Sequence, residues 1–211
     1  MSMFENIADE VVKGHAEKVR ELVEQAISQE ISAEEILNKG LVAGMNVVGD
    51  KFRNNEFFIP EVLVSARAMN TGLDRIKPLL AEARVRAKGK VVIGTVKGDL
   101  HDIGKNIVGM MLQGAGFEII DLGADVPKER FLEVAEKEKA DVIGMSALLT
   151  TTMIYMKEVI QALDAGGLRK SIRVIVGGAP VTQSYADKIQ ADGYAPDAAS
   201  AVDLTKSLLG V

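Results

Sequence analysis

Asp99 and His101 are the residues of this chain whose types and spacing best fit a chemical role. They follow the apolar run 91–96, which predicts a strand that delivers its loop to the carboxyl edge of a sheet, where open α/β folds bind ligands. Asp99 can accept a hydrogen bond from one ring nitrogen of His101, which leaves the other nitrogen's lone pair free for a metal. Glycines at 98 and 104 leave room for a wide, flat ligand. The alternative interpretation is a structural turn.

The elements that must position this loop alternate between strand and helix from Val91 onward. The predicted strands are 91–96, 117–122, 141–146 and 173–177, with a short fifth strand near 193–195. The predicted helices are 104–115, which follows the loop, then 127–139, which Pro127 opens, 151–165, 182–191 and 198–209. This alternation predicts an α/β fold with a doubly wound, parallel, five-stranded sheet of the Rossmann-like or flavodoxin-like kind.

The first part of the chain is expected to be helical throughout. Ser32 and Glu35 form a capping box, the pair Asn54-Asn55 ends the helix that follows it, and Pro60 suits the first turn of another. The two apolar stripes are Ile36, Leu37, Leu41, Met45, Val48 and Phe52, then Leu63, Ala66, Met69, Leu73 and Ile76. Four helices with short connections predict a small bundle over 1–86, and the polar stretch 81–90, with Arg84 and Arg86, predicts a linker to a second domain over 87–211.

Composition limits the partners and the compartment. The chain has 211 residues, 47% of them hydrophobic, and its net charge of −5 comes from interspersed signs. Without a basic face, nucleic acid and anionic membranes are not expected partners. The chain has no cysteine and no apolar run near the roughly 20 residues that span a bilayer. A cytoplasmic protein is therefore expected.

The stretch from Gly94 to Pro127 resembles the cobalamin-binding domain of corrinoid-dependent methyltransferases and methionine synthase. The resemblance includes Asp99-x-His101-x-x-Gly104 and two later motifs at strand ends, Ser146-x-Leu148 and Gly177-Gly178. It implies that His101 is the cobalt ligand, that Asp99 orients it, and that the hydroxyl of Thr152 extends the hydrogen-bond chain. It also implies cofactor contacts at Asp102, Ile103, Gly104, Ser146, Leu148, Thr150, Gly177 and Gly178.

The helical part is similar to the cap domain that precedes the cobalamin-binding domain in methionine synthase and in small corrinoid proteins. The similarity lies in 45–52 and in Phe58-Ile59-Pro60-x-Val62. It implies that Phe52, Ile59 and Val62 cover the upper face of the corrin. On composition alone, these apolar residues fit a bundle core equally well. His15, near the start of a charged helix, is interpreted as a surface residue.

The resemblance implies a corrinoid methyl carrier, similar to those serving methylamines, methanol, glycine betaine or aryl methyl ethers. Cobalt(I) would accept a methyl group from a substrate-specific methyltransferase, and a second methyltransferase would pass it to tetrahydrofolate or coenzyme M. A reductive activation protein is a further expected partner, and the carrier is not expected to turn over alone. The alternatives are a non-catalytic cobalamin sensor, a fragment of a longer enzyme, a flavodoxin-like domain with a structural His-Asp pair, and a cobalamin-dependent mutase subunit.

Overall fold

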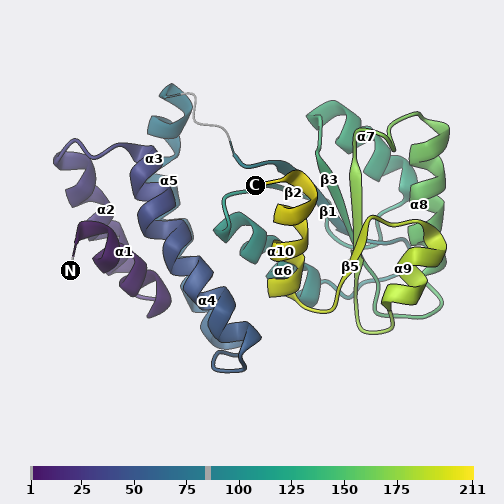
Figure 1. Ribbon diagram of the computed structural model, residues 1–211, viewed down its shortest axis with the longest axis horizontal. Helices are drawn as coiled ribbons and strands as arrows, with labels where there is room; N and C mark the ends of the chain where they lie inside the picture. Colours follow the sequence, from purple (N-terminus) through teal and green to yellow (C-terminus); the bar gives the residue numbers. More distant parts are fainter. Residues whose placement is uncertain (1, 84–86) are drawn as a thin grey trace. The chain divides into compact units, whose positions relative to one another are not determined.

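The computed structural model describes residues 2–83 and 87–211, and the chain divides into two compact units (Figure 1). The helical unit is formed mainly by residues 1–87 and the α/β unit mainly by residues 88–211. Arg84 and Arg86 of the predicted linker lie outside the described residues. In the described ranges, no helix is long and apolar enough to cross a membrane.

The helical unit consists of four successive helical rods in the described part of the chain. They are α1 (Met3–Val12), α2 (Ala16–Ser28), the unbroken run of α3 (Ala33–Glu35), the π-helix η1 (Ile36–Val42) and α4 (Ala43–Arg53), and α5 (Ile59–Glu82). The predicted boundaries are confirmed: Ser32 Oγ accepts a hydrogen bond from Glu35 N at 3.2 Å, and α4 ends at Arg53 with Asn54 as its C-cap. Of the predicted capping box only this half is present, because the Glu35 carboxylate accepts from Ser32 Oγ and not from Ser32 N. Pro60 lies in the first turn of α5. The predicted bundle of helices is therefore present.

Two details of the helical unit depart from the predicted apolar spacing. Ile36 and Leu41 are fully buried although they are five positions apart, one more than the usual spacing on one face of an α-helix. The π-helix η1 accommodates this spacing because it bonds residue i to i+5. In α5 the prediction for Leu63 is wrong, since its side chain is exposed. Val62 takes its place on the buried face with Ala66, one helical turn further along.

The α/β unit is built on a five-stranded, all-parallel sheet in the order β2-β1-β3-β4-β5. The strands are β1 (Lys90–Thr95), β2 (Glu118–Asp121), β3 (Val142–Ser146), β4 (Arg173–Gly177) and β5 (Gly193–Ala195). The helices are α6 (Ile103–Gly114), α7 (Lys128–Glu138), α8 (Ile154–Ala165), α9 (Gln183–Ile189) and α10 (Ala198–Leu209). The predicted fold class is confirmed, including the short fifth strand.

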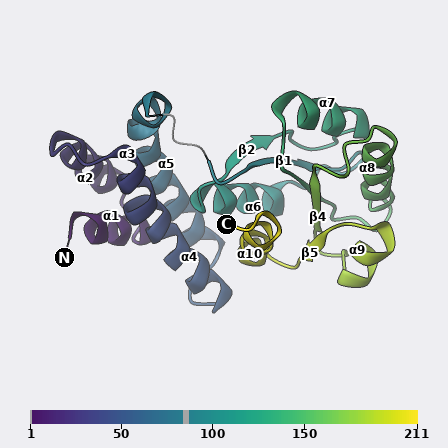
Figure 2. The same cartoon turned by 45° about the horizontal axis from the view of Figure 1, so that its top comes forward.

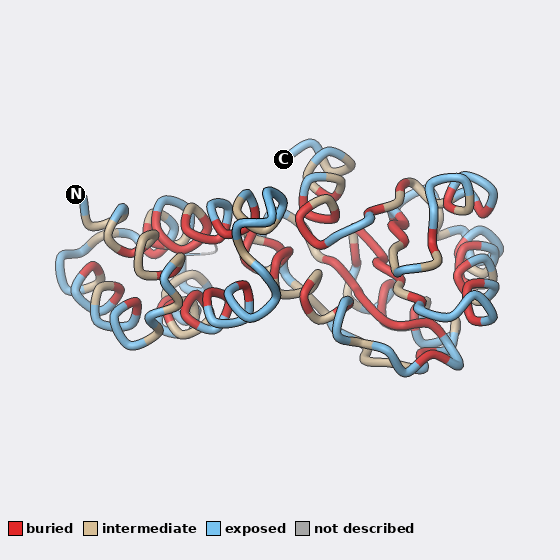
Figure 3. The backbone as a smooth tube through the Cα atoms, turned by 90° about the horizontal axis from the view of Figure 1, so that it is seen from below, coloured by how far each residue is buried: buried red, intermediate tan, exposed pale blue. Residues whose placement is uncertain are grey.

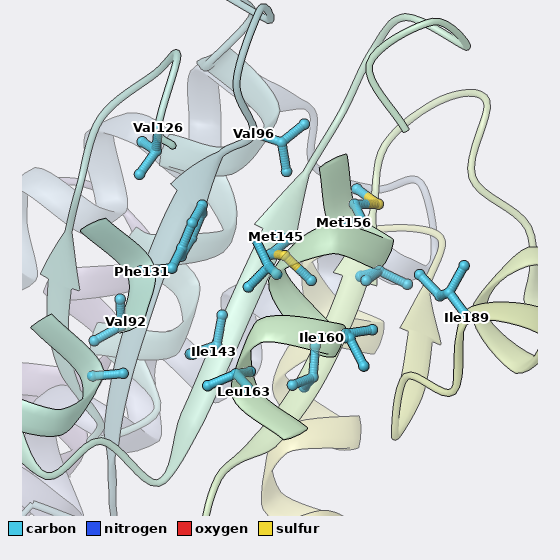
Figure 4. Packing of buried hydrophobic residues seen from close by; sticks show 14 of the residues in the cluster. Val92, Val96, Val126, Phe131, Ile143, Met145, Met156, Ile160, Leu163 and Ile189 are labelled. Carbon is cyan, nitrogen blue, oxygen red and sulfur yellow. The ribbon is translucent and has the colours of Figure 1, made fainter. Parts of the chain in front are cut away.

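Helices cover both faces of the sheet, as Figure 2 shows: α6 and α10 lie on one face, and α7, α8 and α9 on the other. The central strands β1, β3 and β4 are buried along most of their length, and β2 at the edge is not (Figure 3). A parallel sheet buried on both faces needs such continuous apolar strands. On the α7–α9 face, Phe131 and Met156 pack with Ile143 of β3 in one cluster (Figure 4).

Three strands end at the same edge of the sheet. Thr95, the last residue of β1, pairs with Ser146 of β3, and Ser146 pairs with Gly177 of β4. The chain leaves β1 toward β2 on one side and returns to β3 on the other, so the order of strands reverses between β1 and β3. Ligands of open α/β sheets bind at such a reversal, outside the carboxyl ends of the strands.

Candidate functional site

His101 lies in the loop that joins β1 to α6, at the carboxyl edge of the sheet. Its backbone is fixed from the end of the strand, because the buried Thr95 donates a hydrogen bond from Oγ1 to His101 O at 3.1 Å. The imidazole itself is 52% exposed. The ring is thus presented to solvent by an anchored backbone.

Asp99 is fully buried and accepts hydrogen bonds from two directions. Its Oδ1 is 2.7 Å from His101 Nδ1 and 3.1 Å from His101 N. Its Oδ2 accepts from Leu148 N at 2.8 Å, from Leu149 N at 3.1 Å and from Thr152 Oγ1 at 2.8 Å. The carboxylate therefore connects the His101 loop with the segment that follows β3.

The bond to Asp99 fixes which nitrogen of His101 is available. An ionised carboxylate only accepts hydrogen bonds, so Nδ1 of the neutral ring carries the proton and Nε2 keeps its lone pair. An outer carboxylate that binds one ring nitrogen is the usual way in which proteins orient a metal-ligating histidine. The geometry therefore offers one oriented, solvent-accessible nitrogen donor.

The fold holds Asp99 in its ionised form. Burial by itself would raise the pKa of this carboxyl group, but hydrogen bonds from His101, from Leu148 N and from Thr152 outweigh it and hold the pKa well below its usual range. Thr152 Oγ1 also lies 2.9 Å from Leu149 O, so its single proton has two acceptors within reach. The predicted chain His101–Asp99–Thr152 is thus present in the structure.

The depressed pKa of Asp99 predicts an acid-dependent contribution to stability. A carboxyl group whose pKa is lower in the folded than in the unfolded chain stabilises the fold above its unfolded pKa, about 3.9, and that contribution is lost as the pH falls toward the folded pKa. We expect the free energy of unfolding of the cofactor-free wild type to fall more steeply below about pH 4 than that of Asp99→Asn. Urea unfolding across this range measures it, and parallel profiles would contradict it.

Of the other predicted cofactor contacts, two have structural roles of their own. Asp102 accepts hydrogen bonds from Asn106, at Oδ2 from the side chain (3.1 Å) and at the backbone carbonyl from N (2.8 Å), and so fixes the first turn of α6. Gly178 has φ +123°, and a Cβ there would lie 1.9 Å from Ala147 O. By contrast, a Cβ added at Gly104 would meet no atom within 4 Å. Open space at Gly104 leaves room for a ligand beside His101.

Exposed apolar side chains flank His101 in its own loop and also lie in the segment after β3 whose amides bond Asp99. Ile103 is 71% exposed and Leu148 is 43% exposed, and both were predicted as cofactor contacts. Leu100 and Leu149 are also exposed, although neither was among the predicted cofactor contacts. Leu100 could have been found because it adjoins His101 in the sequence, whereas Leu149 is brought to Asp99 only by the fold, through its backbone N. Exposed leucines around one nitrogen donor fit a large ligand with apolar edges.

The remaining predicted residues are dispersed. Thr150 is exposed in the turn after β3, while Ser146 is partly buried at the end of that strand. In the helical unit, Ile59 is exposed, Phe52 is partly buried and Val62 is fully buried. The side chains of Ile59 and Phe52 are accessible to a ligand, whereas the side chain of Val62 is not. Contact of these three with a cofactor stays a prediction.

The fold and the oriented imidazole are those of a ligand-binding protein with one nitrogen donor available to a metal. Comparison with known proteins is specific: residues 89–203 match the B12 binding domain, and residues 3–77 match a second family of the same description. The chain belongs to the B12-binding family. The expected cofactor, cobalamin, is confirmed by this membership, which speaks against the alternative of a flavodoxin-like domain that binds another ligand.

Relatives resemble the chain over both of its units. A dimethylamine corrinoid protein of Methanosarcina acetivorans is 48% identical over 207 residues, which cover 98% of this chain and 97% of that protein. A cobalamin-binding protein from Desulfitobacterium hafniense matches with a TM-score of 0.81 at 30% identity, covering 99% of this chain and 98% of that one. One chain of the methanol:cobalamin methyltransferase complex of Methanosarcina barkeri matches with a TM-score of 0.89 at 33% identity, covering 99% of this chain and 80% of that one.

The residues at the site fit a corrinoid. Imidazole is a common metal ligand in proteins, His101 Nε2 is available, and the leucines beside it suit the edge of a macrocycle. Among the described residues, no group of three or more His, Cys, Asp or Glu side chains is placed to hold an ion. The fit therefore rests on the single donor of His101.

Proposed function

We propose that this chain is a methyl carrier that works between two methyltransferases. The observation that carries the proposal is the exposed imidazole of His101, held through Nδ1 by the buried Asp99 at 2.7 Å. When bound, the corrinoid supplies a cobalt centre that takes up and releases a methyl group. The exposed setting of His101 suits a centre that partner proteins must reach.

The protein's own residues have two tasks in this function. His101 would hold the metal through Nε2, and whenever that nitrogen is not bound to the metal it would be open to a proton. Asp99, held ionised by its hydrogen bonds, stabilises the imidazolium that results. Thr152 donates to the same carboxylate and holds it in place. His101, Asp99 and Thr152 would thereby set how strongly Nε2 binds the metal, while the cofactor carries the methyl group.

The methyl donor in this proposal is a small methylated amine. Several relatives at 43–48% identity are named as dimethylamine or trimethylamine corrinoid proteins, and the methanol complex matches at 33%. A substrate-specific methyltransferase would deliver the methyl group, and a second one would pass it to coenzyme M or tetrahydrofolate. A reductive activation protein completes the proposed set of partners. In this scheme Phe52 and Ile59 of the helical unit would shield the bound cofactor between transfers.

A reconstituted transfer assay tests the proposal. The full chain is loaded with hydroxocobalamin, reduced, and incubated with a dimethylamine-specific or a methanol-specific methyltransferase and the matching labelled donor. We expect label to reach the protein-bound cofactor with the amine system, and then to reach coenzyme M or tetrahydrofolate once a second methyltransferase is added. Cofactor that binds but never exchanges label with any methyltransferase would contradict the carrier and favour a cobalamin sensor.

A further inference from the structure

The segment Asp121–Val126, here named the β2 loop, lies beside the loop that carries His101. It continues the parallel pairing past the end of the strand: Thr95 N donates to Gly123 O at 2.9 Å, and Val126 N donates to Thr95 O at 3.0 Å. An isolated bridge joins Val96 with Val126. The β2 loop is therefore attached to the residues that lead directly into the His101 loop.

Asp125 of the β2 loop holds the backbone around Asp99. Its N donates to Asp99 O at 2.9 Å, and its Oδ1 accepts from Gly98 N at 2.7 Å. Asp125 has φ +55°, a left-handed conformation that is uncommon for residues with a side chain but that Asp and Asn adopt more readily than most. Asp125 thus holds the peptide groups on both sides of the Gly98-Asp99 pair, through Gly98 N on one side and Asp99 O on the other.

Asp121 holds the other side of His101 through a buried lysine. The side chain of Lys105, in the first turn of α6, is 1% exposed, and its Nζ lies 2.5 and 2.6 Å from the two carboxylate oxygens of Asp121. Nζ also donates to Asn106 Oδ1 at 2.6 Å, and Asn106 donates from Nδ2 to Asp102 Oδ2 at 3.1 Å. This network connects the β2 loop with the residue that follows His101.

We infer that Asp121 and Asp125 are positioning residues that set the orientation of the His101 imidazole. The ring is half exposed, so packing alone does not fix it. Its direction depends on Asp99 Oδ1 and on its own backbone, and the β2 loop holds the chain on both sides of that pair. The inference rests on the proposed function in that His101 is the metal ligand, but the positioning itself is a property of the cofactor-free chain.

The chain is well suited to a direct test, because it has only two histidines. Nitrogen-15 NMR of the cofactor-free full chain reports which ring nitrogen of each neutral imidazole carries the proton. We expect His101 of the wild type in the Nδ1–H form that its bond to Asp99 requires. His15, which is exposed at the start of α2, serves as the internal reference.

Two substitutions of Asp125 separate the effect of its side-chain contact from the effect of its left-handed backbone conformation. Asp125→Gly accepts the left-handed backbone and removes the side chain, and with it the oxygen that accepts from Gly98 N. Asp125→Asn keeps an acceptor oxygen and tolerates positive φ. We expect Asp125→Gly to mix the two tautomers of His101 and to weaken hydroxocobalamin binding about 10-fold, as loss of an outer partner of a metal ligand does. Asp125→Asn should keep the single Nδ1–H tautomer of His101 and the wild-type affinity for hydroxocobalamin.

Lys105→Met removes the contact between Lys105 and Asp121, independently of Asp125, and should also mix the two tautomers of His101. The matched control is Lys90→Met, because Lys90 pairs with Glu118 and Glu138 at the opposite end of β1. That control should leave the His101 signal unchanged even if it lowers the melting temperature. A pure Nδ1–H signal in both Asp125→Gly and Lys105→Met, with wild-type hydroxocobalamin binding, would overturn the inference.

His101→Ala separates failure of this inference from failure of the proposed function. If His101→Ala bound hydroxocobalamin with the wild-type spectrum, His101 would not be the ligand and the proposed function would fall, whereas the tautomer measurement on the cofactor-free chain would stand. If His101→Ala abolished the histidine-bound spectrum while Asp125→Gly and Lys105→Met behaved as wild type, only the positioning role of Asp121 and Asp125 would be wrong.

Discussion

Replacing His101 with alanine is expected to abolish the histidine-bound spectrum of the cobalamin-loaded protein and to weaken cobalamin binding by at least about 100-fold. Loss of an outer partner of a metal ligand costs about 10- to 100-fold, and the ligand itself contributes more than its partner. Absorption spectra during hydroxocobalamin titration measure both effects. The fold should persist, because the ring is half exposed and the anchoring bond at His101 O comes from the backbone.

The matched control for this prediction is His15→Ala. His15 is also exposed and also bonds a carboxylate through Nδ1, at 2.8 Å from Glu10 Oε2. It lies at the start of α2 in the helical unit, and its interpretation as a surface residue is confirmed. The control should bind cobalamin with the wild-type spectrum. An unchanged spectrum in His101→Ala would contradict the assignment of His101 as the cobalt ligand.

The sheet could be predicted from the sequence because its signal is local and strong. Runs such as 91–96 and 141–146 contain consecutive β-branched or apolar residues, as strands buried on both faces must. The π-helix over Ile36–Val42 could not be predicted, because the helical period assumes a constant number of residues per turn. Leu63 was wrongly placed for a related reason: two neighbouring positions, 62 and 63, both fit an apolar stripe, and only packing decides between them.

The site was predictable where its chemistry lies in nearby side chains. Asp99 and His101 are two residues apart, so their bond is visible in the sequence. The hydrogen bonds from the amides of Leu148 and Leu149 to Asp99 could not be predicted, because every residue type except proline has a backbone donor. These two amides also lie 49 and 50 residues from Asp99 along the chain. Asp125 was missed because its contacts depend on two loops that meet only in the folded sheet.

Gly178→Ala is expected to destabilise the cofactor-free protein by about 3 to 5 kcal/mol, which is large for a single methyl group. A Cβ at this position would lie 1.9 Å from Ala147 O and 2.9 Å from Ala147 C, and these are backbone atoms that cannot turn aside. The backbone at Gly178 also has φ +123°, which side chains disfavour. The end of β4 and the segment after β3 can approach so closely only with glycine here.

The control for Gly178→Ala is Gly167→Ala, which isolates the backbone conformation from the close approach. Gly167 has φ +71°, but nothing lies within 4 Å of the Cβ position. Its substitution should cost only the left-handed penalty of about 1 kcal/mol. Urea unfolding of both variants without cofactor measures the difference. Equal losses would mean that the two segments are not held this close in the cofactor-free chain. Gly178 would then be required by the bound cofactor, as the resemblance to other cobalamin domains implies, and not by the fold that receives it.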